Sequence, residues 1–272
     1  MTTTLLTGLP RSGTTLICAL LNDCRNTVAL AEPLRLEHHG NRQRAVAEID
    51  DFVTATRRQL LQEKQAVSTH VAGKIPDNWV SEPTALGQFR SIQTELGAIP
   101  FTKPLTPDFH LFIKHPGEFS ALSDLLAPRY PMIAVVRNPL AVLASWQTVP
   151  LAVSTGRLPV AEAFNPDLAA RLKKIDDRLD RQVALLEWLL ELYATFRPEQ
   201  ILRYEDLLQS PLDALAKLKV QADVPLRRLA PHDILQRYPS VNLHVLSIAL
   251  LKIAPSCEKF YPGITEKLED IA

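Results

Sequence analysis

The feature that most constrains the fold is the N-terminal segment TLLTGLPRSGTTLICALL, which occupies residues 4–21. An apolar run is followed by a loop bounded by Gly8 and Gly13, and two threonines, Thr14 and Thr15, open a second apolar run. This pattern predicts a buried strand, a tight loop and then a helix that begins at Thr14. A strand joined to a helix in this way is typical of α/β domains built on a parallel sheet.

The loop between these two elements has the composition of an anion-binding site. At the start of a helix, backbone N–H groups point at a bound anion, and glycines let the backbone approach it closely. The G-x-x-x-x-G spacing is that of the phosphate-binding loop of nucleotide enzymes, but Thr14 replaces the lysine and Arg11 lies inside the loop. In nucleoside triphosphatases that lysine contacts the β- and γ-phosphates, and the next residue holds Mg²⁺. Its absence favours a ligand that has no γ-phosphate and binds without metal.

The rest of the chain alternates between apolar strand-like runs and segments with helical spacing. Strands are expected over 4–7, 27–32, 109–116, 132–139 and 199–208. Helices are expected over 41–65, 118–127 and 139–146, from Asn165 to about Phe196, and from 243 onwards, whereas 67–110 and 147–165 are expected to be irregular, with short helices in 67–110. The alternation predicts a single α/β domain, residues 1–272, in which helices flank a parallel β-sheet.

Ligands of such sheets bind at the carboxyl ends of the strands, so the residues that follow strands are the candidates for a site. The β-branched run MIAVV ends in Arg137, where a triphosphatase has a metal-binding carboxylate. Asn138 is the expected N-cap of the next helix, and Ser145 lies about two turns into that helix. A guanidinium at this place favours a second phosphate that is bound directly, without metal, and Ser145 could share that phosphate.

Taken together, these segments resemble the family of sulfotransferases that use 3′-phosphoadenosine 5′-phosphosulfate (PAPS). PRSGTT (10–15) resembles the loop for the 5′-phosphosulfate, RNPLAVLAS (137–145) the motif for the 3′-phosphate, and RYEDLL (203–208) a segment beside the nucleotide. The resemblance extends over most of the chain and implies the P-loop nucleoside-triphosphatase-like sulfotransferase fold. The nucleotide-binding residues that it implies are Arg11, Ser12, Gly13, Thr14, Thr15, Arg137, Ser145 and Tyr204.

Within that family, the chain is most similar to the branch that includes tyrosylprotein sulfotransferases. In a gap-free count from Arg11, Glu32 falls on the catalytic glutamate of that branch, and IKHPGEF (113–119) puts Lys114 on its catalytic lysine. The arginine that follows the catalytic glutamate in that branch aligns here with Leu34, and the nearest arginine, Arg35, is one position away. The segment between VNL (241–243) and IAP (253–255) is also short. Specificity for peptide tyrosine therefore does not transfer with the resemblance.

The resemblance also implies catalytic roles. A base removes the proton of an acceptor hydroxyl, and cations stabilise charge on the departing phosphate oxygen. Glu32 is the expected base, and Lys114 and Arg11 are expected to hold the bridging and sulfuryl oxygens. His115 is the rival base, because other sulfotransferases use a histidine after a comparable strand. Strand alternation turns Lys114 and His115 to opposite faces, so only one of them is expected in the site.

The acceptor is expected to be a small molecule, sugar, lipid or peptide with a free hydroxyl. By elimination, the irregular segments 67–110 and 147–165 are expected to line its site. Candidate residues in or beside these segments are Trp79, Phe89, His110 and Trp146. Two rival functions remain: a non-catalytic 3′-phosphoadenosine nucleotide-binding protein, which would need neither Glu32 nor Lys114, and a P-loop kinase, which would need the missing lysine and a metal carboxylate.

Composition limits the partners. The formal net charge is zero, so neither nucleic acid nor an anionic membrane is an expected partner. No apolar run approaches the roughly 20 residues of a membrane-spanning helix. The three cysteines lack metal-ligand spacing and indicate a reducing, cytoplasmic compartment. The leucine stripe that begins at Leu168 is expected in the core, with a homodimer seam as the alternative.

Overall fold

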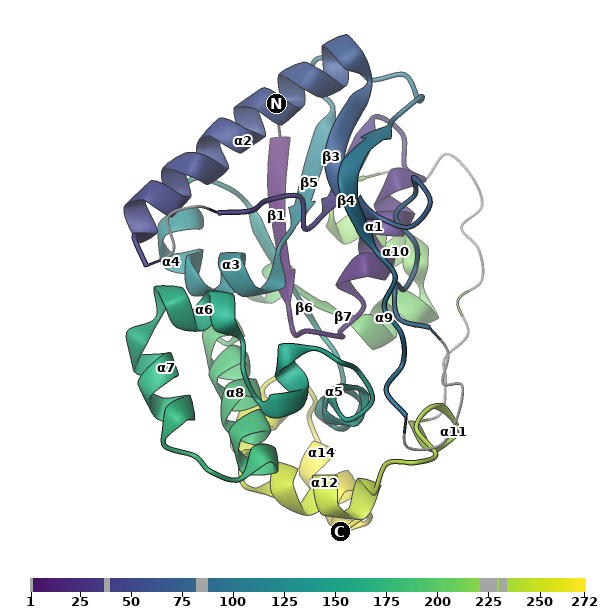
Figure 1. Cartoon of the computed structure of the whole chain (residues 1–272). Helices are drawn as coiled ribbons and strands as arrows, with labels where there is room; N and C mark the ends of the chain where they lie inside the picture. Colours follow the sequence, from purple (N-terminus) through teal and green to yellow (C-terminus); the bar gives the residue numbers. More distant parts are fainter. Residues whose placement is uncertain (1, 37–39, 82–87, 221–228, 230–233) are drawn as a thin grey trace.

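The computed structural model describes residues 2–36, 40–81, 88–220, 229 and 234–272 (Figure 1). Its centre is a five-stranded sheet of order β2-β5-β1-β6-β7 in which every neighbouring pair is parallel. The strands are β1 (Thr2–Gly8), β2 (Thr27–Ala31), β5 (His110–Lys114), β6 (Met132–Val136) and β7 (Ile201–Arg203). The predicted α/β fold with a parallel sheet flanked by helices is therefore confirmed.

Strand register brings the predicted site segments to one edge of the sheet. Lys114, at the end of β5, pairs with Leu6 on one side and with Ala31 on the other. Val136, at the end of β6, pairs with Arg203, the last residue of β7. Because all five strands are parallel, the residues that follow them lie along the same carboxyl edge.

Alternation along the strands explains why helices cover both faces of the sheet. Leu6, Phe112 and Val135 point to one face, where they form a hydrophobic cluster with α1 (Thr14–Asn22), α9 (Tyr204–Gln209) and α10 (Pro211–Lys217). Leu5 and Ile113 point to the other face. That face is covered by α2 (Arg42–Glu63), α3 (Pro116–Ala121), α5 (Pro139–Trp146) and α8 (Arg178–Tyr193).

The remaining helices complete the second face and the lower part of Figure 1. They are α4 (Ser123–Leu126), α6 (Pro159–Phe164), α7 (Pro166–Lys173), α11 (Ile234–Arg237), α12 (Leu243–Leu251), α13 (Ala254–Glu258) and α14 (Ile264–Glu269), with the 3₁₀ helices η1 (Ala152–Thr155) and η2 (Pro198–Gln200). In the described parts of the chain, no helix has an apolar stretch long enough to cross a membrane.

Several expectations about secondary structure were wrong. The segment 147–165, expected to be irregular, contains η1 and α6, and the helix expected over 118–127 is divided into α3 and α4. Within 67–110 the described residues form no helix, and instead β3 (Gln65–His70) pairs antiparallel with β4 (Glu95–Pro100). The sequence of β4, ELGAIP, contains a glycine and a proline and is mostly exposed, so it lacks the usual strand signal. This antiparallel pair packs beside β2, where Ser68 Oγ accepts a hydrogen bond from the Ala31 N–H at 3.0 Å.

The expected long helix from Asn165 to Phe196 is two helices, α7 and α8. Asn165 caps the first, as its position before a proline suggested, and Asp177 caps the second by accepting from the Asp180 N–H at 2.8 Å. A side chain that can cap a new helix competes with continuation of the old one. Leu168, Leu172 and most apolar residues of α8 are buried in the core of the same chain, and Leu179, Trp188 and Leu192 are partly buried against it.

Candidate active site

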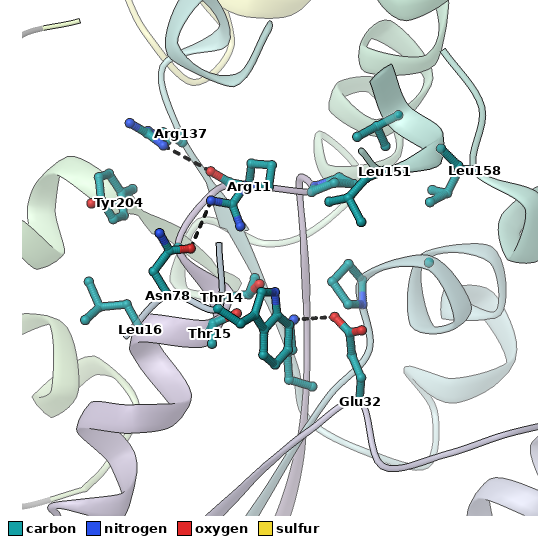
Figure 2. A pocket seen from close by; sticks show the side chains of 18 of the residues that line it. Arg11, Thr14, Thr15, Leu16, Glu32, Asn78, Arg137, Leu151, Leu158 and Tyr204 are labelled. Carbon is teal, nitrogen blue, oxygen red and sulfur yellow. Dashed lines mark hydrogen bonds and ion pairs between the residues drawn. The ribbon is translucent and has the colours of Figure 1, made fainter. Parts of the chain in front are cut away.

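A cavity of about 830 Å³ opens at the carboxyl edge of the sheet (Figure 2). Its walls come from the loop after β1, the residues that follow β2, β5 and β6, the start of α9, and the segments 77–79 and 151–160. It therefore collects most of the segments that the sequence predicted to follow strands.

The loop after β1 is shaped by its two glycines. Gly8 has a φ of +151°, and a Cβ there would lie 2.4 Å from the carbonyl oxygen of Val135 on the neighbouring strand. Gly13, the N-cap of α1, has a φ of +92°, and a Cβ there would lie 2.4 Å from the ring of Tyr204. Any other residue at these positions would be strained and would clash as well. From behind, Trp146 Nε1 donates to the carbonyl of Pro10 at 2.9 Å.

The loop presents part of the predicted nucleotide-binding set to the cavity. Gly13, Thr14 and Thr15 line it at the N-terminus of α1, where backbone N–H groups and the helix dipole favour an anion. Ser12 is fully buried and is not among the lining residues. Arg11 has a φ of 74°, an uncommon value for a residue with a side chain, and its guanidinium faces the cavity.

Guanidinium groups gather around Arg11. Its Nε donates to Ser145 Oγ at 3.3 Å, its Nη2 donates to Asn78 Oδ1 at 3.0 Å, and Arg90 Nη2 donates to the same Ser145 oxygen at 3.2 Å. Arg137 Nη1 donates to the Arg11 carbonyl at 3.1 Å (Figure 2). Burial and the neighbouring charges of Arg90, Arg137 and Arg237 lower the pKa of Arg11 to about 10.

Two tyrosines lie against this arginine cluster. The Arg137 guanidinium lies 4.7 Å from the ring centroid of Tyr204, and that of Arg90 lies 5.7 Å from the ring of Tyr238. Burial opposes ionisation of Tyr238, but Arg137 and a hydrogen bond with Ser145 outweigh it and lower the pKa of this phenol. Both tyrosines line the cavity, so the cations have aromatic faces beside them.

The end of β2 meets the end of β5 in an ion pair. Lys114 Nζ donates to Glu32 Oε1, and the ammonium also lies 4.4 Å from the ring centroid of Trp79. The Lys114 side chain is only 3% exposed, whereas the Glu32 side chain is 36% exposed at the cavity wall. Glu32 has a φ of 47°, and its backbone is held by hydrogen bonds with Lys114 at 2.8 Å and Thr69 at 3.1 Å.

His115 lies outside the cavity wall. Its Nε2 accepts a hydrogen bond from the Leu34 N–H at 2.9 Å, its Nδ1 lies 3.1 Å from Glu118 Oε2, and its side chain is 1% exposed. Burial alone would raise the pKa of Glu118, but His115 outweighs it and lowers that pKa. As strand alternation predicted, only Lys114 of these two neighbours faces the cavity.

Of the four residues proposed for the acceptor site, only Trp79 lines the cavity. Phe89 is 55% exposed, and Trp146 is buried beneath the loop. His110 lies at the opposite end of β5, where its ring stacks on Phe112 with 4.0 Å between centroids. These three expectations were wrong because sequence position within a segment does not give the direction of a side chain.

The sequence analysis missed Asn78, Arg90, Arg237 and Tyr238, all of which line the cavity. Arg90 lies in the segment that was assigned to the acceptor as a whole, and Arg237 and Tyr238 lie near the C-terminus, where no motif marks them. Only the folded chain brings them to the loop after β1.

Residues 4–228 match the model of the sulfotransferase family. This chain belongs to the sulfotransferase family. The match covers the loop after β1, Glu32, Lys114, Arg137 and Tyr204, and it ends before Arg237. The predicted family is therefore confirmed, while the similarity to the tyrosylprotein branch stays a prediction.

Solved sulfotransferase structures resemble the chain weakly. STF9 from Mycobacterium avium has a TM-score of 0.38 at 14% identity and covers 93% of this chain and 76% of its own. A sulfotransferase domain from the curacin biosynthetic pathway has a TM-score of 0.35 at 15% identity, with 99% and 96% covered. STF1 from Mycobacterium tuberculosis H37Rv has a TM-score of 0.34 at 15% identity, with 99% and 76% covered. No curated protein matches the sequence significantly.

Proposed function

We propose that this sulfotransferase transfers a sulfuryl group from PAPS to an acceptor hydroxyl. The observation that carries the proposal is the gathering of Arg11, Arg90, Arg137 and Arg237 at one cavity. Burial and mutual repulsion both disfavour the charge on Arg11, as its lowered pKa reflects. A nucleotide with phosphate groups at its 3′ and 5′ positions would supply the missing negative charge without metal.

In this proposal, the two ends of the donor bind different parts of the cavity. The N–H groups of Gly13, Thr14 and Thr15 bind the 5′-phosphosulfate at the N-terminus of α1. Arg137, which lines the cavity, binds the 3′-phosphate, and Ser145, which is fully buried and does not line the cavity, is the second residue proposed for this phosphate. The buried Ser145 hydroxyl already accepts hydrogen bonds from Arg11 and Arg90, so it orients these two guanidinium groups. A contact between Ser145 and the phosphate requires that one of these arginines turns toward the ligand. Tyr204 lies beside the adenosine, under Arg137.

Transfer requires one proton acceptor and cations at the breaking bond. The acceptor oxygen forms the new bond to sulfur, the bond between sulfur and the phosphate oxygen breaks, and Glu32 takes the hydroxyl proton. Lys114 and Arg11 stabilise charge on the departing oxygen and on the sulfuryl oxygens, and the products are a sulfate ester and 3′,5′-adenosine bisphosphate. Glu32 and Lys114 are in contact at the cavity wall, as this division of roles requires.

Glu32 suits the base better than His115. The exposed part of its carboxylate faces the cavity, whereas the His115 Nε2 lone pair is occupied by the Leu34 N–H at 2.9 Å. For His115 to accept a proton there, that hydrogen bond would have to break. We assign His115 a positioning role: it links the turn after Glu32 to Glu118 in α3.

A transfer assay tests the proposal. Radiolabelled PAPS is incubated with the full chain and a panel of alcohols, phenols, sugars and tyrosine peptides, with and without a chelator. We expect labelled ester and 3′,5′-adenosine bisphosphate in equal amounts, unaffected by the chelator and nearly abolished in Lys114→Ala. Binding of 3′,5′-adenosine bisphosphate without transfer to any acceptor would instead favour the non-catalytic nucleotide-binding protein.

A further inference from the structure

One side of the cavity is lined by aliphatic side chains. Leu34 and Leu36 come from the segment after β2, Leu151 and Val153 from the start of η1, and Leu158 and Val160 from the start of α6. We call these six residues the aliphatic wall. In Figure 2, Leu151 and Leu158 lie across Arg11 from Arg137 and Tyr204, so the aliphatic wall and the predicted nucleotide end are on different sides of the cavity.

Resting on the proposed function, we propose that the acceptor is a neutral lipophilic alcohol whose hydrocarbon part binds the aliphatic wall. In Figure 2, Glu32 lies on the same side of Arg11 as Leu151 and Leu158, away from Arg137 and Tyr204. A hydroxyl at Glu32 therefore leaves the remainder of the acceptor on the side opposite the nucleotide, against this wall.

Half of the aliphatic wall is exposed to the cavity, whereas Leu34, Leu36 and Val153 are buried although they also line it. Leu151, Leu158 and Val160 are only partly buried, although residues of this kind are usually fully buried in a domain of this size. Gly117 of α3 also lines the cavity, and a Cβ added there would lie 3.7 Å from both Leu158 and Val160, so this glycine leaves room for about one methyl group beside them. An apolar ligand would remove their exposed surface from water, and burial of a methylene group stabilises a complex by about 0.8 kcal/mol.

Two charged residues also line the cavity near this wall, and both have partners. Arg35 is exposed and donates to the Leu34 carbonyl at 2.9 Å. Glu118 lies against His115, and its pKa is lowered, so it stays a carboxylate. Glu118 would repel an acidic acceptor, and the aliphatic side chains offer no hydrogen bonds to the hydroxyls of a sugar, which are costly to bury unpaired.

A homologous series of primary alkanols from butanol to octanol tests the inference. With saturating PAPS, kcat/KM should rise about threefold to fourfold for each added methylene, which corresponds to about 0.8 kcal/mol. A neutral sugar and an acidic tyrosine peptide serve as comparison acceptors and should be transferred more slowly than octanol. A flat or falling series, or a sugar or peptide that equals octanol, would overturn the inference.

Two variants locate the effect. Leu158→Asn and Leu151→Asn should each raise the KM for octanol about tenfold and leave the affinity for 3′,5′-adenosine bisphosphate unchanged. The matched control is Leu212→Asn, because Leu212 is 60% exposed and does not line the cavity. It should leave both quantities unchanged. An equal rise of KM in Leu212→Asn, or none in the two wall variants, would contradict the assignment of the wall.

Direct binding separates failure of the inference from failure of the proposed function. Alkanol affinity for the protein saturated with 3′,5′-adenosine bisphosphate is measured by titration calorimetry. If alkanol affinity rises with chain length but no sulfuryl group is transferred, the lipophilic site is supported and the proposed catalysis is contradicted. If the nucleotide binds but no alkanol does, the lipophilic site is contradicted and the proposed function is not.

Discussion

At the scale of single residues, the account depends on the contact between Glu32 and Lys114. The lysine is buried, and its ammonium contacts both the Glu32 carboxylate and the Trp79 ring. The carboxylate is partly exposed and free on its other side to meet an acceptor in the cavity. The same contact that fixes the lysine thus places a proton acceptor beside it.

Glu32→Gln should preserve the fold and nucleotide binding but lower single-turnover transfer by about two to four powers of ten, because the amide cannot accept the proton. His115→Asn should lower it less, since its proposed role is to hold the turn after Glu32. Both rates are measured with saturating PAPS, and both variants are titrated with 3′,5′-adenosine bisphosphate as a control. An active Glu32→Gln beside an inactive His115→Asn would assign the base to His115.

Arg137→Ala and Lys114→Ala should fail in different ways. Arg137 contacts a phosphate that does not change in the reaction, so its loss should weaken nucleotide affinity by roughly tenfold to a hundredfold, from about 1.5–3 kcal/mol for a charge-assisted hydrogen bond. Lys114 meets charge that develops during cleavage, so its loss should mainly lower turnover. Equal losses of nucleotide affinity in the two variants would contradict these roles.

At the scale of elements, the loop after β1 and α9 form one unit, because Gly13 leaves room for the Tyr204 ring. Gly13→Ala should abolish nucleotide binding and lower the free energy of unfolding, measured in urea, by more than the 1–2 kcal/mol that left-handed backbone costs a residue with a side chain. Gly73→Ala is the matched control, because Gly73 has a φ of +76° but nothing within 4 Å of its added Cβ. If both variants lower the free energy of unfolding equally, the contact between residue 13 and Tyr204 does not explain the loss.

The amino end of β5 should make stability depend on pH through His110. Burial, with smaller effects from Arg57 and Lys219, lowers the pKa of His110 to about 4, below the 6.5 of the unfolded chain. Between these values the unfolded chain binds more protons, so the contribution of His110 to stability falls as pH drops from about 6.5 to about 4. Free energies of unfolding of wild type and His110→Asn should therefore converge over that range, and a constant difference would contradict the shift.

Elements marked by their own neighbouring residues could be predicted from the sequence. Contacts between residues that are far apart in the sequence could not. The loop after β1 and the Arg137 turn each combine a buried strand with a distinctive next residue, so their sequences alone indicated them. Arg90 reaches Ser145 only because the segment that connects β3 to β4, two strands that the sequence did not indicate, brings it there. The apolar stripe persists across the break: α7 ends at Lys173 and Asp177 is the N-cap of α8, and Leu172 before the break and Val183 after it are both buried.

At the scale of the whole molecule, a chain with zero net charge has a local excess of positive charge at one cavity, which in the described part of the chain is lined by six Lys and Arg side chains and three carboxylates. The sheet makes this possible, because its parallel strands end at one edge and deliver Arg11, Lys114 and Arg137 from three strands. Four of the six residues of the aliphatic wall come from later segments, at the starts of η1 and α6. We therefore expect the donor site and the acceptor site to respond separately to substitution, as the variants above test.

The most direct test of the central claim is a calorimetric titration of the full chain with 3′,5′-adenosine bisphosphate, with and without a chelator, beside Mg·ATP. The account predicts metal-independent binding by the bisphosphate, and far weaker binding of Mg·ATP because the loop lacks its lysine. At a bisphosphate concentration one hundred times its dissociation constant, the free energy of unfolding should rise by about 2.7 kcal/mol. Equal or tighter binding of Mg·ATP, abolished by the chelator, would contradict the account.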